Sequence, residues 1–450
     1  MMKRDEMLGL LRDALKGSPA DETELVASSG SSSLTRYANS VIHQNVHESN
    51  TPVVARVAVG KRVGVSAINS LDPEALRNAI ARATEIARQS PEVPMFPGFP
   101  KAPRAPEVKA YSPATASMPP DARAEAVARA VAIAKSESVT LSGAYRVDAR
   151  SLAVVNTSGT EQHYDATSAS LSIFATAEDG VSGSARGYAV GTEGIDVEAT
   201  TRQAVEKCKA AADPADFDPE AVDVILEPRA TAEIMGWLGF TAFGAKQVQE
   251  GQSFLAGRIG QKVMGDAVTI YDDGFDPEGV PVPFDYEGVP KSKVTMIEAG
   301  VARGPVYDSL TAAKDGVPST GHANTAAYRT GPGPSNIFIA PGDKTFDELM
   351  SEVKRGLLVT SFHYLNGLLD TRKALFTGMT RDGTFLVENG KIVKSVKNLR
   401  FTESMMRAFS NVAGLTKERE IVGFSWAGIA SVTAPTILIR DFTFTGATEF

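Results

Sequence analysis

Histidine side chains could bind a catalytic metal ion. The histidines of this chain, however, are not spaced along the sequence as in a zinc-binding motif. The five histidines are His43, His47, His163, His322 and His363, and neither an HExxH nor an HExxxH string occurs. Hydrolysis by zinc needs two or three such ligands and a base that activates the bound water. His43 and His47 have helical spacing, but their segment alternates like a strand, in which residues four apart lie about 13 Å apart. We therefore expect no metal site in this chain.

The sequence gives no better support for catalysis by a serine or cysteine nucleophile. The serines of Gly30-Ser31 and Gly183-Ser184 lack the Gly-x-Ser-x-Gly frame that holds a nucleophile on a sharp turn. Cys208 is the single cysteine, and it lies between two lysines in a stretch with helical periodicity. An incidental helical cysteine explains it better than a reactive thiol. We therefore assign no catalytic residue.

The acidic charge balance limits the partners that this chain can bind. Its 450 residues carry a net charge of −8, and no basic stripe interrupts them. Nucleic-acid binding draws much of its affinity from neutralised phosphates, so we expect no direct contact with DNA or RNA. A single cysteine fits a reducing compartment. The N-terminal stretch lacks the apolar core of a signal peptide, and no run of 18 apolar residues occurs, so we expect a cytoplasmic protein that spans no membrane.

Periodicity predicts both helices and strands in the first half of the chain. Apolar residues at helical spacing indicate helices at 4–16, from Asp72-Pro73 onward, at 122–136 and at 196–212. Alternation indicates a hairpin of 53–59 with 62–68, and strands between 139 and 189. We expect a loop at the serine-rich stretch 28–33. The stretch 91–120 holds nine prolines and is expected to be a surface excursion.

The second half is predicted to be rich in strands. The polar segment 213–219 is the candidate boundary, and a helix is expected at 229–249. Short apolar runs cut by Gly, Pro and Asp follow, with only two short helices at 346–355 and 403–412. The predicted fold class is α+β. It consists of an N-terminal α+β domain with long helices over 1–212 and an antiparallel β-barrel-like C-terminal domain over 220–450.

Several strings in this chain resemble those of the TldD/PmbA family, also described as modulators of DNA gyrase. The strings are Thr35-Arg36-Tyr37-Ala38-Asn39, Val268-Thr269-Ile270-Tyr271-Asp272-Asp273-Gly274, Asp285-Tyr286-Glu287-Gly288, Ser319-Thr320-Gly321-His322-Ala323 and Gly383-Thr384-Phe385-Leu386-Val387-Glu388-Asn389-Gly390. They follow the family's order and span nearly the whole chain. The resemblance implies an α+β domain followed by a β-barrel-like domain. It also implies dimers that enclose a channel for extended peptides.

The chain departs from the catalytic members of that family at the metal site. Those members carry HExxxH on a helix at the start of the second domain, and a later cysteine completes the zinc site. Counting back from Gly251, the motif falls on residues 236–241, where this sequence has Gly236, Trp237 and Thr241 at the ligand and base positions. No cysteine follows Cys208. The pattern resembles PmbA/TldE-type members, which lack the HExxxH motif.

The resemblance therefore implies a non-catalytic subunit that works with a TldD-type metalloprotease, which would hold the zinc. Such a subunit would help to bind extended or unfolded peptides for proteolysis or peptide maturation, by backbone pairing with exposed strand edges. The residues expected to line or support the channel are Trp237, Phe240, Thr241, Phe243, Phe254 and His322. For the four aromatic residues, a place in an ordinary hydrophobic core is the competing interpretation.

Two other functions stay open at this point. The chain could be a stand-alone homodimeric peptide-binding or scaffold protein without protease activity. It could also be an enzyme of unrecognised chemistry, if folding pairs His322 with Glu287 or His363 with Asp370. The substrate peptide and the choice between heterodimer and homodimer are left open by the sequence.

Overall fold

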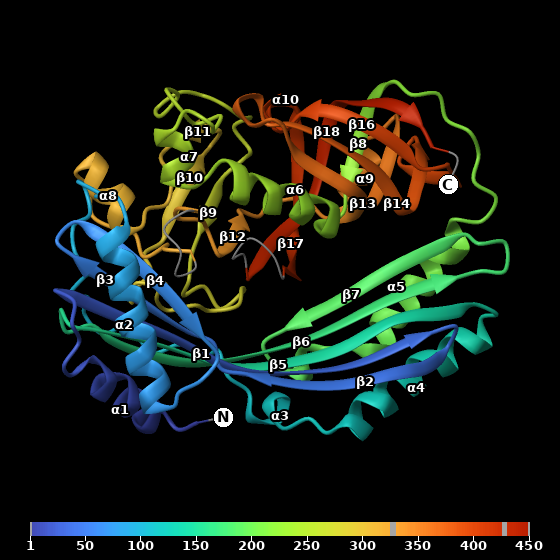
Figure 1. Cartoon of the computed structure of the whole chain (residues 1–450). Coiled ribbons are helices and arrows are strands. Elements are labelled where there is room, and N and C mark those ends of the chain that lie inside the picture. Colours follow the sequence, from blue (N-terminus) through green and yellow to red (C-terminus); the bar gives the residue numbers. More distant parts are fainter. Residues whose placement is uncertain (1, 325–329, 425–429, 449–450) are drawn as a thin grey trace.

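The computed structural model describes residues 2–324, 330–424 and 430–448. Two strand-rich parts face each other (Figure 1). The part before residue 212 contains one seven-stranded sheet, and the part after residue 220 contains one eleven-stranded sheet. The predicted α+β class is confirmed. None of the helices in the described ranges is long and apolar enough to cross a membrane.

The first sheet is antiparallel throughout and centres on one long strand, β1 (Glu22–Ala38). Its order is β4 (Arg62–Ile68), β3 (Val53–Val59), β1, β5 (Thr140–Asn156), β6 (Glu161–Thr176) and β7 (Ser182–Ala189). β2 (Val41–Asn50) pairs with the second half of β1, beyond the point where β3 ends its pairing. The sheet curves beneath the second part of the chain (Figure 1).

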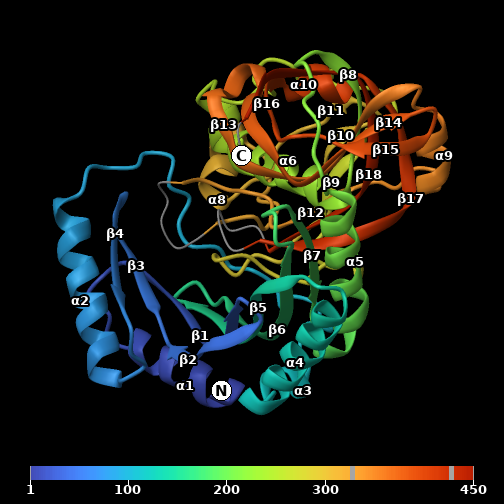
Figure 2. The ribbon, with the colours of Figure 1, turned by 90° about the vertical axis from the view of Figure 1, so that its right-hand side faces the viewer.

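Four helices cover the face of this sheet that is turned away from the second part (Figure 2). They are α1 (Arg4–Leu15), α2 (Pro73–Gln89), α4 (Pro120–Ser136) and α5 (Val197–Ala210). The odd-numbered residues of β5 and β6, among them Tyr145 and Leu171, pack with Val127 of α4 and Ala204 of α5. Strand residues alternate between faces, so the even-numbered residues point to the second part.

The serine-rich stretch 28–33 lies within β1, so the prediction of a loop there was wrong. Ser28 to Ser33 pair with Leu152 to Val147 of β5, and from Gly30 onward β2 completes the other side. Small polar residues usually favour turns, but pairing along both edges satisfies the backbone here and overrides that preference.

The proline-rich stretch 91–120 has little regular structure apart from α3 (Pro113–Ala116). It runs along β6, and side chains of that region satisfy its backbone. The amide of Ala102 donates to Thr160 Oγ1 at 2.8 Å, and the amide of Ser112 donates to Thr167 Oγ1 at 2.9 Å.

A 3₁₀ turn at Thr192–Gly194 connects β7, at one edge of the sheet, to α5.

The second sheet contains a closed ring of strands. β18 (Ser431–Ala447) pairs with β16 (Leu399–Ser404), followed by β14 (Leu375–Glu388), β13 (Arg355–Asp370) and β8 (Ala221–Leu226), and β8 pairs back with β18. Beyond the ring lie β12 (Asn336–Ile339), β9 (Ile270–Asp272), β10 (Val294–Glu298) and β11 (Val301–Ala302). β15 (Lys391–Ser395) adds to β14, and β17 (Val412–Gly423) adds to β18. Not every pairing is antiparallel, because β12 with β18 and β13 with β8 are parallel.

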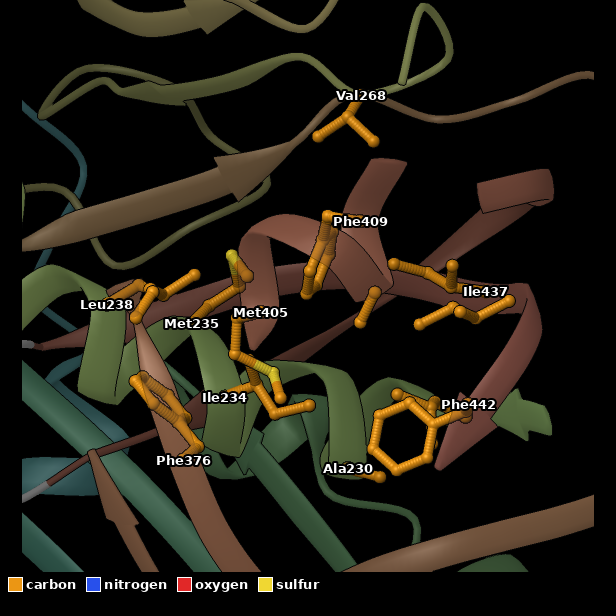
Figure 3. Close-up of a cluster of buried hydrophobic side chains, with 14 of the residues drawn as sticks. Ala230, Ile234, Met235, Leu238, Val268, Phe376, Met405, Phe409, Ile437 and Phe442 are labelled. Atoms are coloured by element: carbon orange, nitrogen blue, oxygen red, sulfur yellow. The ribbon is translucent and has the colours of Figure 1, made fainter. Parts of the chain in front are cut away.

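The helix predicted at 229–249 is two helices, α6 (Pro228–Thr241) and α7 (Ala245–Gln249). The break at Gly244 lets another chain segment approach, because a Cβ there would lie 2.2 Å from the carbonyl oxygen of Pro332. α6 packs its Ile234 and Leu238 face into the core of the second part (Figure 3). Short helices complete this part: α8 (Ser309–Asp315), α9 (Phe346–Ser351), a 3₁₀ turn at Thr371–Lys373 and α10 (Met405–Ser410).

Candidate functional site

A cavity of about 740 Å³ lies between the inner face of the first sheet and the second part of the chain. Residues of β1, β5, β6 and β7 form its floor. Residues of β17 and of the segments 280–286, 323–324 and 333–335 form the opposite wall. This is the space into which the even-numbered strand residues point, so the pleat of the first sheet decides which side chains line it.

Small polar side chains dominate the floor of this cavity. β1 contributes Ser28, Gly30 and Ser32, and β6 contributes Ser168 and Ser170. The registers place Ser32 and Ser168 on either side of Asp148. Because these side chains are short, they leave the sheet face open. The stretch 28–33, which was predicted to be a loop, is therefore a strand segment that lines the cavity.

Several of the charged groups around the cavity are already bound to other protein groups. On β5, Arg146 lies 2.9 Å from the Asp148 carboxylate. Lys207 of α5 donates to Glu227 at 2.5 Å. Arg229 of α6 donates from Nη1 to Ser184 Oγ of β7 at 2.7 Å, which links the two parts of the chain at the edge of the cavity.

Arg150 has a different surrounding from these residues. It lies on β5 between Gly30 and Ala166 in the register, and its Nη2 is 3.5 Å from the hydroxyl of Tyr164. Tyr164, together with Tyr286 and Tyr188, raises the pKa of Arg150 above its ordinary value against the opposing effect of burial. The guanidinium is therefore a permanent positive charge on the cavity floor.

A second polar group, beside the cavity, is buried. His322 Nε2 lies 2.8 Å from Asp272 Oδ1, and both side chains are inaccessible. The other carboxylate oxygen of Asp272 accepts from the amides of Ser335 and Asn336, at 2.6 and 2.7 Å. Burial, and then the nearby Lys291, lower the pKa of His322. The arrangement fixes the start of β12 and leaves no room for a substrate.

The string Asp285-Tyr286-Glu287-Gly288 joins the second part to the first sheet. Glu287 lies 3.8 Å from Arg56 of β3, and Gln162 of β6 donates to the carbonyl of Gly288 at 2.9 Å. Burial raises the pKa of Asp285 to about 6 and that of Glu287 to about 8. Neither of the histidine–carboxylate pairs considered from the sequence forms. Asp272 is the partner of His322, and Asp370 pairs with Lys373.

None of the six residues predicted to line a channel is among the lining residues of this cavity. Phe243 and Phe254 are fully buried in the core of the second part, with ring centroids 6.1 Å apart. Trp237 is partly buried, and Phe240 is 40% exposed beside it. Thr241 donates to the carbonyl of Trp237 at 2.8 Å. His322 lies in the Asp272 pair, so a shared role for the six stays a prediction.

Sequence reasoning missed Arg150, Tyr164 and Tyr188. A signal was present in Tyr145-Arg146-Val147-Asp148-Ala149-Arg150, where apolar and charged residues alternate. Alternation of this kind predicts a strand with one buried face and one polar face. The pattern alone does not show that the polar face lies under another part of the chain.

The side chains of α6 do not fit a zinc ion at the positions that the family resemblance indicates. Gly and Trp carry no metal ligand, and one Thr hydroxyl is a poor one. A Cβ at Gly236 would lie 2.9 Å from the ring of Phe424, so an imidazole has no space there. Across the described ranges, no group of three His, Cys, Asp or Glu side chains could hold a metal ion.

Comparison with known families gives three matches in sequence order. The models for the PmbA/TldA metallopeptidase domain 1, central domain and C-terminal domain match residues 23–87, 114–211 and 219–446. The third match alone covers half of the chain.

Individual relatives agree with these matches. A "Metalloprotease" of Methanothermobacter thermautotrophicus is 27% identical over 217 residues, 47% of this chain and 46% of the relative. A "Metalloprotease TldD homolog" of Haemophilus influenzae is 29% identical over 172 residues, 38% of this chain and 35% of the relative. The matched stretches thus span less than half of these proteins. The crystal structure of TldE from Thermococcus kodakarensis superposes with a TM-score of 0.86 at 23% identity, over 98% of this chain and all of that one.

Proposed function

Because the chain belongs to the TldD/PmbA family, we propose that it is a PmbA/TldE-type subunit without a catalytic centre of its own. In this proposal, a TldD-type metalloprotease holds the zinc ion and breaks the peptide bond. This chain helps to bind an extended or unfolded peptide. The residues of α6 carry the proposal, because Gly236, Trp237 and Thr241 offer neither the ligands nor the base that zinc hydrolysis requires.

The cavity supports the peptide-binding half of the proposal. A volume of about 740 Å³ with a floor of small polar residues suits a flexible chain more than a rigid apolar molecule. In the described sheets, β7 and β17 each pair with a single neighbouring strand, and both line the cavity. An extended peptide can pair its backbone with such an edge, which gives affinity with little dependence on sequence.

An exposed apolar surface supports the partner half of the proposal. Phe240 of α6 and three residues of β13, Tyr364, Leu368 and Leu369, are between 40% and 79% exposed. Gly367 of β13 lies against the ring of Trp237, so α6 and this end of β13 are adjacent. Apolar side chains gathered in one place on a surface mark sites of protein association. We propose that another subunit covers them.

The test is co-expression with a TldD-type metalloprotease, followed by a peptide-cleavage assay of the complex and of each chain alone. We expect cleavage by the complex, sensitivity to a chelator, and no cleavage by this chain alone. The double variant Leu368→Asp/Leu369→Asp should prevent complex formation. Ile259→Asp is the matched control, because Ile259 is also exposed, at 47%, and lies outside this surface.

Two results contradict the proposal. Chelator-sensitive cleavage by the purified chain alone would give it a catalytic centre. A stable homodimer that does not bind a TldD-type protein would favour the stand-alone peptide-binding or scaffold protein.

A further inference from the structure

Arg150 is a charged side chain on the cavity floor whose charge no ion pair balances in the described part of the chain. The nearest acidic residue on its strand is Asp148, and Arg146 already holds that carboxylate at 2.9 Å. The polar contact made by Arg150 is with a neutral hydroxyl, that of Tyr164 at 3.5 Å. The guanidinium has five N–H donors, and this contact uses one of them.

The neighbouring strands keep space open around this guanidinium. The residues beside Arg150 in the register are Gly30 on β1 and Ala166 on β6, and both line the cavity with it. Neither carries a side chain that could fold over the arginine or pair with it. The two strands beside β5 therefore supply no anion to Arg150 at these positions, and the side of the residue that lines the cavity is where an anion can reach it.

The tyrosines around Arg150 add neutral donors to the same place. Burial raises the pKa of Tyr164 and of Tyr188, so both hydroxyls keep their protons at neutral pH. A protonated phenol can donate a hydrogen bond to an anion without repelling it. The guanidinium fork matches a planar carboxylate by two parallel hydrogen bonds, which makes this pair stronger than a neutral one.

We propose that Arg150 binds a carboxylate of the peptide in the cavity, with Tyr164 beside it. This inference rests on the proposed function, because it names a group that the bound peptide must carry. The single guanidinium fork of Arg150 suits a single carboxylate. Asp148, two residues away on the same face, would repel an anion of higher charge. The carboxylate could be the C-terminus of the peptide or an acidic side chain.

Three hexapeptides of otherwise uncharged residues, all N-acetylated, separate these sources. One has a free C-terminal carboxylate, one has a C-terminal amide and a central Glu, and one has the amide and a central Gln. Isothermal titration calorimetry with the full chain measures each dissociation constant. We expect at least one carboxylate peptide to bind about ten- to a hundredfold tighter than the uncharged one, as a charged hydrogen bond implies.

Variants assign that preference to Arg150. Arg150→Gln should bring the carboxylate peptide to within about twofold of the uncharged peptide, and Arg150→Lys should keep part of the preference because the charge remains. Arg129→Gln is the control, and it should keep the preference because Arg129 lies on α4, pairs with Glu198 at 2.8 Å and does not line the cavity. Thermal unfolding of each variant checks that the fold is retained.

The outcomes distinguish this inference from the proposed function. If all three peptides bind with equal affinity, the carboxylate site is wrong and peptide binding stands. If no carboxylate peptide binds to the wild-type chain, or if Arg150→Gln keeps the preference, the inference is overturned. If the preference depends on Arg150 but no TldD-type partner gains activity, the site stands and the subunit role fails.

Discussion

Arg56 of the first sheet and Glu287 of the second part lie 3.8 Å apart with both side chains buried. The same guanidinium donates from Nε to Glu24 of β1 at 2.7 Å. Glu287 also accepts from the amide of Ser309, at 2.9 Å. One cation thus lies between two buried carboxyl groups from different parts of the chain. This group is one of the contacts that join the two parts beside the cavity.

Replacing Arg56 should destabilise the protein strongly. Arg56→Met leaves Glu24 buried without its cation, and removal of one partner from a buried ion pair costs about 3–5 kcal/mol. Urea unfolding measures the change in the free energy of unfolding. Arg62→Met is the control on the next strand, because Arg62 pairs with Glu92 at the surface, where an ion pair contributes about 1 kcal/mol or less. Equal losses from both variants would show that the buried group has no special role.

Glu287 should make the stability of the protein depend on pH. Burial, only partly offset by Arg56, raises the pKa of Glu287 to about 8, whereas an unfolded Glu titrates near about 4.3. Between these values the folded state holds a proton that the unfolded state has lost. The contribution of this group is therefore complete below about pH 4.3 and is lost as the pH rises through about 8.

Comparison with Glu287→Gln isolates this effect. The amide does not titrate, so the wild-type protein should lose stability relative to the variant between pH 5 and 8, at up to about 1.4 kcal/mol per pH unit. Unfolding free energies across that range provide the measurement. The exposed carboxylate variant Glu92→Gln should show no such difference. A relative gain by the wild-type protein with rising pH would mean that Glu287 is ionised beside Arg56.

The sequence predicted most helices and strands because their signals are local. Asp72 accepts from the amides of Glu74 and Ala75 as an N-cap, and the hairpin turns at Gly60 as expected. The error at 28–33 has a non-local cause. Ser and Gly have low strand preference, and only the pairing partners of β1, more than a hundred residues away on β5, make them a strand.

The cavity was harder to predict for the same reason. Arg150 and Tyr188 reach the same region because β5 and β7 both pair with β6, and Tyr286 joins them only because the second part lies over the first sheet. The aromatic residues near α6 attracted attention because they cluster in sequence. Nearness in sequence on an apolar helix is also what a hydrophobic core produces.

Two interpretations of those aromatic residues, a lined peptide channel and an ordinary hydrophobic core, predict different effects of substitution. Phe243→Ala should lower stability by about 3–5 kcal/mol, because Phe243 is fully buried against Phe254. Phe240→Ala should cost under about 1 kcal/mol, because Phe240 is 40% exposed. Neither side chain lines the cavity, so the peptide affinity of the folded variants should stay within about twofold. Weaker peptide binding by a stable Phe240→Ala or Phe243→Ala protein would instead support a channel lined by aromatics.

Gly423 of β17 should control the access of peptide to the cavity through Tyr188. A Cβ at Gly423 would lie 2.2 Å from Cε2 of Tyr188, so Gly423→Ala must displace the ring. Tyr188 and Gly423 both line the cavity, so a displaced ring changes the space that is open to a peptide. We therefore expect Gly423→Ala to weaken peptide binding, with a loss of stability of about 1–3 kcal/mol, typical of an overpacked site.

Two further variants test whether the displaced Tyr188 ring is the cause of the weaker peptide binding. Gly446→Ala is the matched control, because its Cβ would meet only Arg400 Cβ at 3.8 Å, an ordinary contact. In the Tyr188→Ala background the alanine at 423 has no ring to displace, so it should have little further effect on affinity, which a double-mutant cycle measures as coupling. If the two substitutions are additive, Gly423 acts on binding by another route, and the displaced ring is not the cause.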